Sequence, residues 1–248
     1  MSGAATLLTE ILKTTRDLRK QNLKSLVVFD LDSTLFDVSP RLERILLDFA
    51  AIPVNKLRFP EQIAKLHNIK TERKDWGIKN ALQRAGLDGH HPEFQEAVFS
   101  YWQKNFFSNH YLQFDVPYEG AVEYTQALHQ AGARIVYLTG RDVERMGVGS
   151  REVLLDWKFP LDENAELVLK PHRSMDDAEF KADWFLTPEA SAFSKVYFFE
   201  NEPVNLNLLK QRASKVEMIF FESTHAGKQQ PPIDIPKVMD FLCHLDEA

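Results

Sequence analysis

A short apolar run that ends in two aspartates constrains the fold of this chain more than any other feature. The run, residues 26–29, contains no polar residue and predicts a strand buried on both faces, as in a parallel sheet. Asp30 and Asp32 follow it directly. Functional groups of open α/β sheets lie at the carboxyl ends of strands, so we expect a site here. The simpler alternative is an Asx-turn, because Asp, Ser and Thr are ordinary turn residues.

Two aspartates at this spacing can share the chemistry of one site. Asp30 can act as a nucleophile or metal ligand, and Asp32 as acid and base or, through its backbone carbonyl, as a metal ligand. The segment Asp30-Leu31-Asp32-Ser33-Thr34-Leu35 resembles DxDxT, the nucleophile motif of phosphatases in the haloacid dehalogenase (HAD) superfamily. The resemblance implies that Asp30 attacks phosphorus and forms an aspartyl-phosphate. It also implies that Asp32 protonates the leaving oxygen and then activates water, and that Mg²⁺ bridges the site.

A long region without strand-like alternation follows, from about residue 37 to residue 115. Apolar residues recur at helical spacing in the stretches 41–51, 78–86 and 93–107. Its aromatic residues are expected to pack in a core rather than to bind a ligand. Its histidines have no metal-like i, i+4 pairing and are expected to serve packing or the surface: His67, His90, His91 and His110. HAD enzymes carry a C1-type cap at this position, and such a cap typically closes over small phosphorylated substrates.

A second strand end lies beyond this region. Residues 134–138 are expected to form a strand, and Thr139, Gly140 and Arg141 follow it. A hydroxyl with exposed backbone amides is a suitable receptor for a phosphoryl oxygen, and glycine lets the backbone approach a ligand closely. Leu138-Thr139-Gly140-Arg141 resembles the second HAD motif, a strand that ends in Thr or Ser. We therefore expect Thr139, Gly140 and Arg141 to contact the substrate.

A fixed cation is required if two carboxylates and a phosphate dianion are to share one site. Two lysines are candidates. Lys170 follows a short strand-like run, and Lys181 lies in a segment that reads as the start of a helix with acidic first-turn residues. HAD phosphatases commonly place this lysine roughly twenty residues before the fourth motif. Lys181 lies 20 positions before Asn201, and Lys170 lies 31 positions before it. We expect Lys181 to be the motif lysine and keep Lys170 as the alternative.

The fourth motif departs from the family pattern. A buried strand, residues 195–199, ends in a polar cluster that contains Glu200, Asn201, Glu202 and Asn205. HAD enzymes usually carry two acidic residues here, as DD or GDxxxD, and these hold Mg²⁺. If Asn201 and Asn205 take those positions, the site has lost formal charge, which Glu200 and Glu202 could restore directly or through water. The metal is thus expected to bind Asp30, the Asp32 carbonyl and an undetermined choice among these four residues.

The order of the elements indicates the fold. Strands alternate with helices outside the inserted region, which predicts a doubly wound, Rossmann-like α/β core with a parallel sheet and a helical cap. We place the core at residues 23–36 and 116–248 and the cap at 37–115. Residues 1–22 are expected to form a helix that packs on the core, and 235–245 a closing helix.

Composition narrows the class of partner. A net charge of −6 and a pI near 5.8 argue against a nucleic-acid surface. The lone cysteine, Cys243, excludes an internal disulfide and fits a reducing compartment. The chain contains no apolar run long enough for a membrane span and no basic start followed by an apolar run. We expect a cytoplasmic protein; its oligomeric state cannot be read from the sequence.

The resemblance implies a Mg²⁺-dependent phosphatase that hydrolyses a small phosphomonoester. Two alternatives stay open. A phosphotransferase or nucleotidase could use the same site. A catalytically weakened, HAD-like binding protein is the other possibility, because Asn201 stands where the family usually has aspartate.

Overall fold

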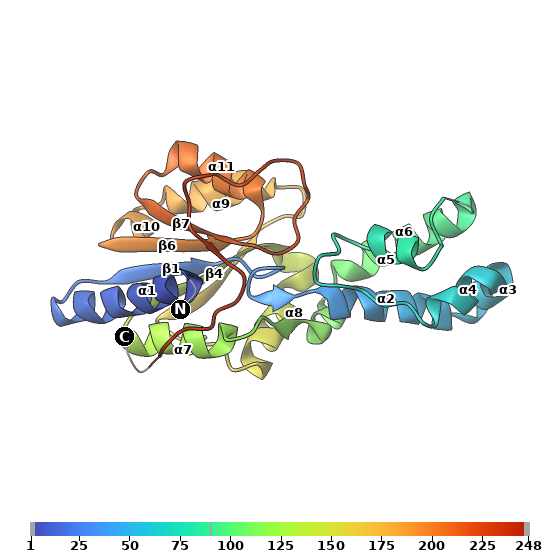
Figure 1. Ribbon diagram of the computed structural model, residues 1–248, viewed down its shortest axis with the longest axis horizontal. Helices are drawn as coiled ribbons and strands as arrows, with labels where there is room; N and C mark the ends of the chain where they lie inside the picture. Colours follow the sequence, from blue (N-terminus) through green and yellow to red (C-terminus); the bar gives the residue numbers. More distant parts are fainter. Residues whose placement is uncertain (1–2, 90, 246–248) are drawn as a thin grey trace.

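The computed structural model describes residues 3–89 and 91–245, so His90 lies outside the described residues (Figure 1). A six-stranded sheet forms the core, in the order β5-β4-β1-β6-β7-β8, and every pairing in it is parallel. Its strands are β1 (Ser25–Phe29), β4 (Arg134–Asp142), β5 (Ala165–Lys170), β6 (Lys195–Glu200), β7 (Val216–Phe221) and β8 (Lys237–Val238). The predicted parallel sheet is confirmed, and β1 lies between β4 and β6 in its interior.

Helices cover both faces of this sheet (Figure 1). Along β1, Val27 and Phe29 join one apolar cluster, whereas Leu26 and Val28 join another, because successive side chains of a strand point to opposite faces. The first face packs against α1 (Gly3–Lys20), α7 (Ala121–Ala131) and α8 (Val143–Asp156). The second packs against α9 (Asp177–Phe185), α10 (Pro188–Ser191) and α11 (Pro203–Arg212). The core is therefore a doubly wound α/β layer structure, as predicted.

A group of helices extends away from one end of the sheet (Figure 1). It comprises α2 (Ser39–Ala51), α3 (Pro53–Arg58), α4 (Pro60–Leu66), α5 (Lys79–Arg84) and α6 (Pro92–Phe106), followed by the 3₁₀ helix η1 (Asn109–Phe114). These helices bury an apolar cluster of their own, which runs from Leu42 to Val98. The two connections to the core pair as a short antiparallel ribbon of β2 (Phe36–Asp37) and β3 (Val116–Pro117). The chain thus leaves and re-enters the core at one place.

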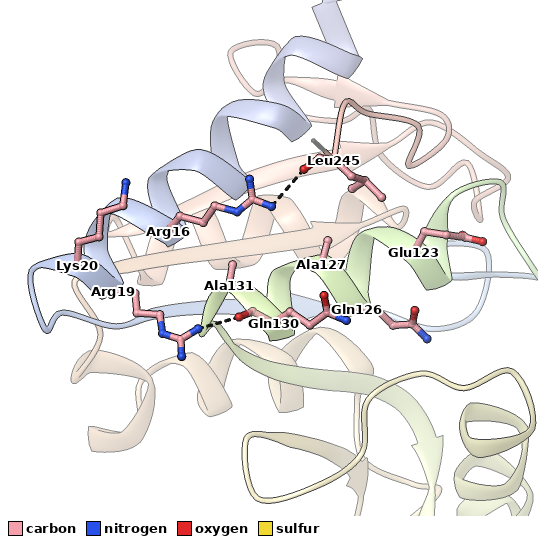
Figure 2. Close-up of a pocket in the computed structure, with 9 residues that line it drawn as sticks. All are labelled: Arg16, Arg19, Lys20, Glu123, Gln126, Ala127, Gln130, Ala131 and Leu245. Atoms are coloured by element: carbon pink, nitrogen blue, oxygen red, sulfur yellow. Dashed lines mark hydrogen bonds between the residues drawn. The ribbon is translucent and has the colours of Figure 1, made fainter. Parts of the chain in front are cut away.

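The N-terminal helix α1 is amphipathic. Leu8, Ile11 and Leu12 are buried on the first face of the core, whereas Arg16 and Arg19 lie beside α7 and donate to backbone carbonyls (Figure 2). A cavity of about 840 Å³ is lined by residues of α1 and α7 at this point. Within residues 3–89 and 91–245, none of the helices has the length and apolar character that crossing a membrane requires.

The prediction of a closing helix over residues 235–245 is wrong. Residues 237–238 form the edge strand β8, which pairs with Phe220 and Phe221 of β7, and the described residues beyond it, up to 245, contain no helix. Val238 and Phe241 are both buried in the sheet's first apolar cluster. Phe241 stacks on Phe221 at a centroid distance of 5.1 Å. Strand pairing and this aromatic contact decide the conformation here.

Two glycines of α8 allow a matched test of packing. A Cβ at Gly149 would lie 2.6 Å from the carbonyl oxygen of Asn109, where α8 crosses η1. A Cβ at Gly147 would make ordinary contacts with the side chains of Leu169 at 3.7 Å and Val143 at 3.9 Å. We expect Gly149→Ala to lower the free energy of unfolding by about 1–3 kcal/mol because backbone must shift. Gly147→Ala should leave it unchanged or raise it by up to ~1 kcal/mol, since alanine favours the helix. Urea denaturation of both variants checks this; equal effects would contradict it.

Candidate active site

Three buried charged side chains meet where β1 and β6 end. Asp30 directly follows β1, and Glu200 is the last residue of β6, the neighbouring strand. The Lys181 ammonium, from α9, donates to Asp30 Oδ1 and to Glu200 Oε2, each at 2.6 Å. All three residues are at most 4% exposed. The sheet and α9 therefore place a lysine between two carboxylates at the edge where the sequence indicated a site.

This cluster carries one more negative than positive charge. Burial raises the pKa of Asp30 to about 7; Lys181 opposes that rise, and the nearby carboxylate of Glu200 adds to it. Burial would lower the pKa of Lys181, but the two carboxylates outweigh it and hold that pKa above its usual range. Lys181 is therefore fixed as a cation, and the cluster carries its full excess of negative charge only at a pH above the pKa of Asp30.

The donor set is compatible with Mg²⁺. That ion usually takes one or two carboxylates and keeps several waters. Asp30 and Glu200 supply two buried carboxylates with charge left over after pairing with Lys181. Among residues 3–89 and 91–245, His, Cys, Asp and Glu side chains form no group of three or more arranged to hold a metal ion. Any metal here would thus depend on these two carboxylates, neutral oxygens and water.

The remaining polar residues of the fourth motif are engaged with the protein. The Asn205 amide donates to Glu200 Oε2 at 2.9 Å, so it holds that carboxylate. Asn201 Oδ1 accepts from the Thr34 hydroxyl at 3.1 Å, and Asn201 Nδ2 donates to the Thr224 carbonyl at 2.6 Å. Glu202 Oε2 accepts from a backbone amide at residue 226. Of the expected metal ligands on this loop, Glu200 lies with Asp30, and Glu202 turns to the neighbouring loop.

The second candidate lysine is placed differently. Lys170, the last residue of β5, pairs with the Asp177 carboxylate and donates to the Met175 carbonyl at 2.9 Å. That carboxylate occupies the space beside Gly140, where a Cβ would lie 2.5 Å from Asp177 Oδ2. The close approach expected at Gly140 is thus made by the first turn of α9. Lys181, not Lys170, contacts Asp30.

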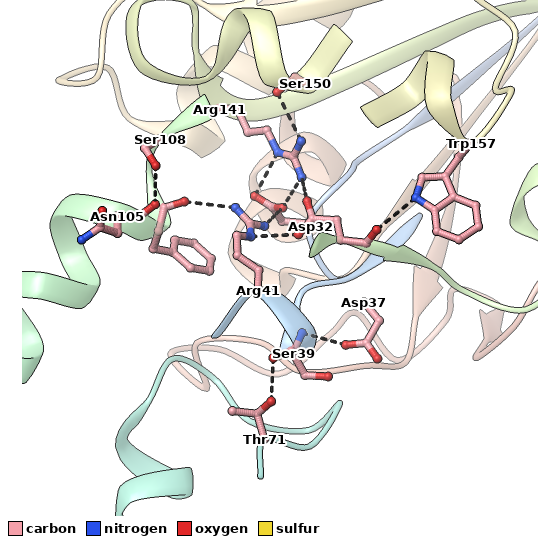
Figure 3. Close-up of polar contacts among 12 residues, drawn as sticks. Asp32, Asp37, Ser39, Arg41, Thr71, Asn105, Ser108, Arg141, Ser150 and Trp157 are labelled. Carbon is pink, nitrogen blue, oxygen red and sulfur yellow. Dashed lines mark hydrogen bonds and ion pairs between the residues drawn. The ribbon is translucent and has the colours of Figure 1, made fainter. Parts of the chain in front are cut away.

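Thr139 and Arg141 lie at the end of β4, which runs to residue 142 and is longer than the sequence indicated. Thr139 is buried, and its hydroxyl accepts from the Arg141 amide at 3.2 Å. The Arg141 guanidinium is 1% exposed and is turned toward Asp32, with N–O distances of 2.6 Å to Oδ1 and 3.4 Å to Oδ2 (Figure 3). Arg141 therefore contacts the candidate acid and base itself.

A second arginine contacts Asp32 from the helical insertion. Arg41, in the first turn of α2, donates to Asp32 Oδ1 at 2.5 Å (Figure 3). Asp115 forms ion pairs with both arginines: its Oδ1 lies 2.9 Å from Arg41 Nε, and its Oδ2 accepts from Arg141 at 2.7 Å. Burial would raise the pKa of Asp32, but the two guanidiniums hold it well below its usual range. Asp32 is therefore an anion held by two arginines.

Arg41 and Asp115 were not predicted from the sequence. A signal was present for Arg41, because it precedes Ile45 and Phe49 by four and eight positions and so shares the buried face of α2. A charged residue on such a face needs a partner. Nothing in the sequence indicates that Asp115, 74 positions later, supplies one.

Comparisons with known proteins support the α/β fold described above. A family model described as haloacid dehalogenase-like hydrolase matches residues 24–175. A HAD-superfamily hydrolase of subfamily IA, variant 1, from Geobacter sulfurreducens PCA is 15% identical, with a TM-score of 0.51 and coverage of 88% of this chain and 93% of that one.

Two further solved structures have the same fold. A candidate phosphatase from Clostridium difficile is 12% identical, with a TM-score of 0.52 over 80% of this chain and 85% of that one. A candidate haloacid dehalogenase-like hydrolase from Burkholderia xenovorans LB400 is 16% identical, with a TM-score of 0.52 over 88% and 94%. No curated protein matches the chain. At these identities the similarity to solved structures concerns the fold alone.

Proposed function

Because the chain belongs to the family of haloacid dehalogenase-like hydrolases, and is therefore an enzyme, we propose that it is a Mg²⁺-dependent phosphatase of small phosphomonoesters. The observation that carries this proposal is the Lys181 ammonium, 2.6 Å from both Asp30 and Glu200 at the ends of adjacent strands. A lysine fixed between two carboxylates can neutralise charge as a phosphate dianion approaches Asp30. Asp30 and Glu200 together carry one more negative charge than Lys181 neutralises when both are ionised, and this charge can attract a divalent cation.

The proposed reaction assigns one role to each residue. Asp30 attacks phosphorus in line and forms an aspartyl-phosphate. Asp32, an anion in the free enzyme, takes up a proton from solvent as the substrate binds and passes it to the departing oxygen. Asp32 then takes a proton from water, which attacks the aspartyl-phosphate and releases inorganic phosphate. Lys181 and the Thr139 hydroxyl hold phosphoryl oxygens. Mg²⁺, held by Asp30, the Asp32 carbonyl and Glu200, would offset the charge between carboxylate and phosphate.

We propose that residues 37–115 form a cap that closes over the substrate. One loop of this region already contacts the site, because the Thr224 hydroxyl donates to the Lys74 carbonyl at 3.0 Å. The Thr224 carbonyl in turn accepts from Asn201 at 2.6 Å. The contact between Thr224 and Lys74 places a loop of the proposed cap beside the site, a position that favours a small substrate. The substrate class proposed here is a phosphorylated metabolite.

Release of inorganic phosphate from a panel of small phosphoesters tests the function. We expect saturable release in the presence of Mg²⁺, loss of release with EDTA, and recovery when Mg²⁺ is restored in excess. Acceptor alcohols added to the same reactions would reveal a phosphotransferase as phosphate transferred rather than released. If phosphate binds but no ester turns over with any divalent metal, the phosphatase proposal is wrong and a binding protein is favoured, with Asn201 as the reason.

A further inference from the structure

Asp32 forms ion pairs both with the core and with the helical insertion. Its Oδ1 lies 2.5 Å from a nitrogen of Arg41 on α2 and 2.6 Å from a nitrogen of Arg141 on β4. One arginine therefore comes from the insertion and one from the core. Resting on the phosphatase function proposed above, we propose that Arg41 is a positioning residue, which fixes the Asp32 carboxylate for its proton transfers together with Arg141.

Arg41 also joins both connections between the insertion and the core. Its own helix starts two residues after β2, and its second guanidinium nitrogen donates to the Phe106 carbonyl, at the end of α6, at 3.1 Å. The guanidinium carbon lies 4.1 Å from the Phe106 ring centroid. Its Nε lies 2.9 Å from Asp115, one residue before β3. A movement of either connection would displace Arg41, and through it the Asp32 side chain.

Burial distinguishes Asp32 from the groups that hold it. The side chains of Arg41, Arg141 and Asp115 are 0–1% exposed, whereas that of Asp32 is 30% exposed. Two arginines and two aspartates balance in charge, so the network needs no further ion. Arginine forks match a carboxylate in geometry and restrict its orientation. The three buried side chains thus hold the Asp32 carboxylate in a fixed orientation. Of these four side chains, only that of Asp32 is exposed enough for a substrate to reach.

A positioning role makes a prediction that a purely structural role does not. A leaving alkoxide requires protonation, whereas p-nitrophenolate leaves readily without it. Misplacing Asp32 should therefore lower kcat/KM strongly for an alkyl phosphate and weakly for p-nitrophenyl phosphate, because kcat/KM reports the steps up to release of the leaving group and not the later activation of water by Asp32. Loss of folded protein, by contrast, lowers both rates equally.

The test compares Arg41→Gln, Arg41→Lys and Arg44→Gln on the best alkyl phosphate and on p-nitrophenyl phosphate. We expect Arg41→Gln to lower kcat/KM about 100-fold for the alkyl ester and less than about tenfold for the aryl ester. Arg41→Lys should recover part of the loss. Arg44→Gln is the matched control, because Arg44 pairs with Asp48 on the same helix without touching Asp32. It should retain wild-type kcat/KM.

A double-mutant cycle with Asp32→Asn completes the test. If Arg41 acts through Asp32, Arg41→Gln should have little further effect once Asp32 is replaced. Equal losses on the two esters, an undiminished loss in the Asp32→Asn background, or wild-type kcat/KM in Arg41→Gln would each overturn the inference and leave the phosphatase function standing. Absence of turnover in the wild-type enzyme would overturn both.

Discussion

Replacing Asp30 by asparagine is expected to lower kcat by at least about four orders of magnitude, because the amide cannot form the acyl-phosphate bond. The fold should be unaffected. Asparagine has the shape of aspartate, and its carbonyl oxygen can still accept from Lys181, which now contacts Asp30 at 2.6 Å. Phosphate release under saturating substrate measures the loss, and thermal unfolding measures the fold. Residual turnover above about 1% of wild type would show that Asp30 is not the nucleophile.

The same substitution has a predicted effect on stability that depends on pH. The pKa of Asp30 is raised from 3.8 to about 7, so the folded protein binds this proton more tightly than the unfolded chain does. The ionised carboxylate therefore lowers the free energy of unfolding, increasingly as the pH rises from 3.8 to about 7. The Asp30→Asn substitution removes that cost, so the variant should be at least as stable as wild type above about pH 7. Asp75→Asn, at a buried cap aspartate paired with Arg84, is the control and should keep wild-type turnover.

Replacing Lys181 by methionine is expected to damage both activity and stability. Without the ammonium, Asp30 and Glu200 face each other as unpaired buried carboxylates. Breaking such a buried pair costs about 3–5 kcal/mol, and loss of the cation should lower kcat about 10³-fold. Urea denaturation and phosphate release measure the two effects. Lys181→Arg, which keeps the charge, should recover most of the stability and less of the activity, so the two roles remain separable if the methionine variant folds poorly.

Lys170→Met is the matched control for this prediction. Lys170 is also buried and paired with an aspartate, but its partner is Asp177 in the first turn of α9. We expect kcat to change by less than about threefold, because this ammonium touches none of the reacting groups. The reverse order of effects, with Lys170→Met the more damaging to kcat, would contradict the placement of Lys181 as the motif lysine.

The strand ends of the site could be predicted because each rests on local pattern. An apolar run followed by polar residues located Asp30, Thr139 and Glu200, and parallel pairing brings such ends to one edge of the sheet. The structure places Lys181, which the spacing to Asn201 favoured over Lys170, at Asp30. The fold class followed from the same alternation of strands and helices.

The contacts between distant segments could not be predicted. The ion pairs of Asp32 join residues nine and 109 positions away, and no periodicity encodes the choice of partner. The prediction of a helix in the C-terminal segment failed for a related reason. Val238 and Phe241 have helical spacing, but pairing with β7 and burial of the Phe241 ring depend on strands that lie elsewhere in the chain. Local pattern gives the element type only where no distant partner competes.

The interior place of β1 has a consequence for how the protein is made. β1 pairs with β4 and β6, which begin 105 and 166 residues after its last residue. During synthesis this apolar strand therefore has no partner strand until β4 and β6 have been made. The helices of residues 39–106, by contrast, complete their own apolar cluster from local contacts. We expect the nascent chain to pass through a state with a folded cap and an exposed β1. That state is the one most prone to aggregate and the one that a chaperone would hold.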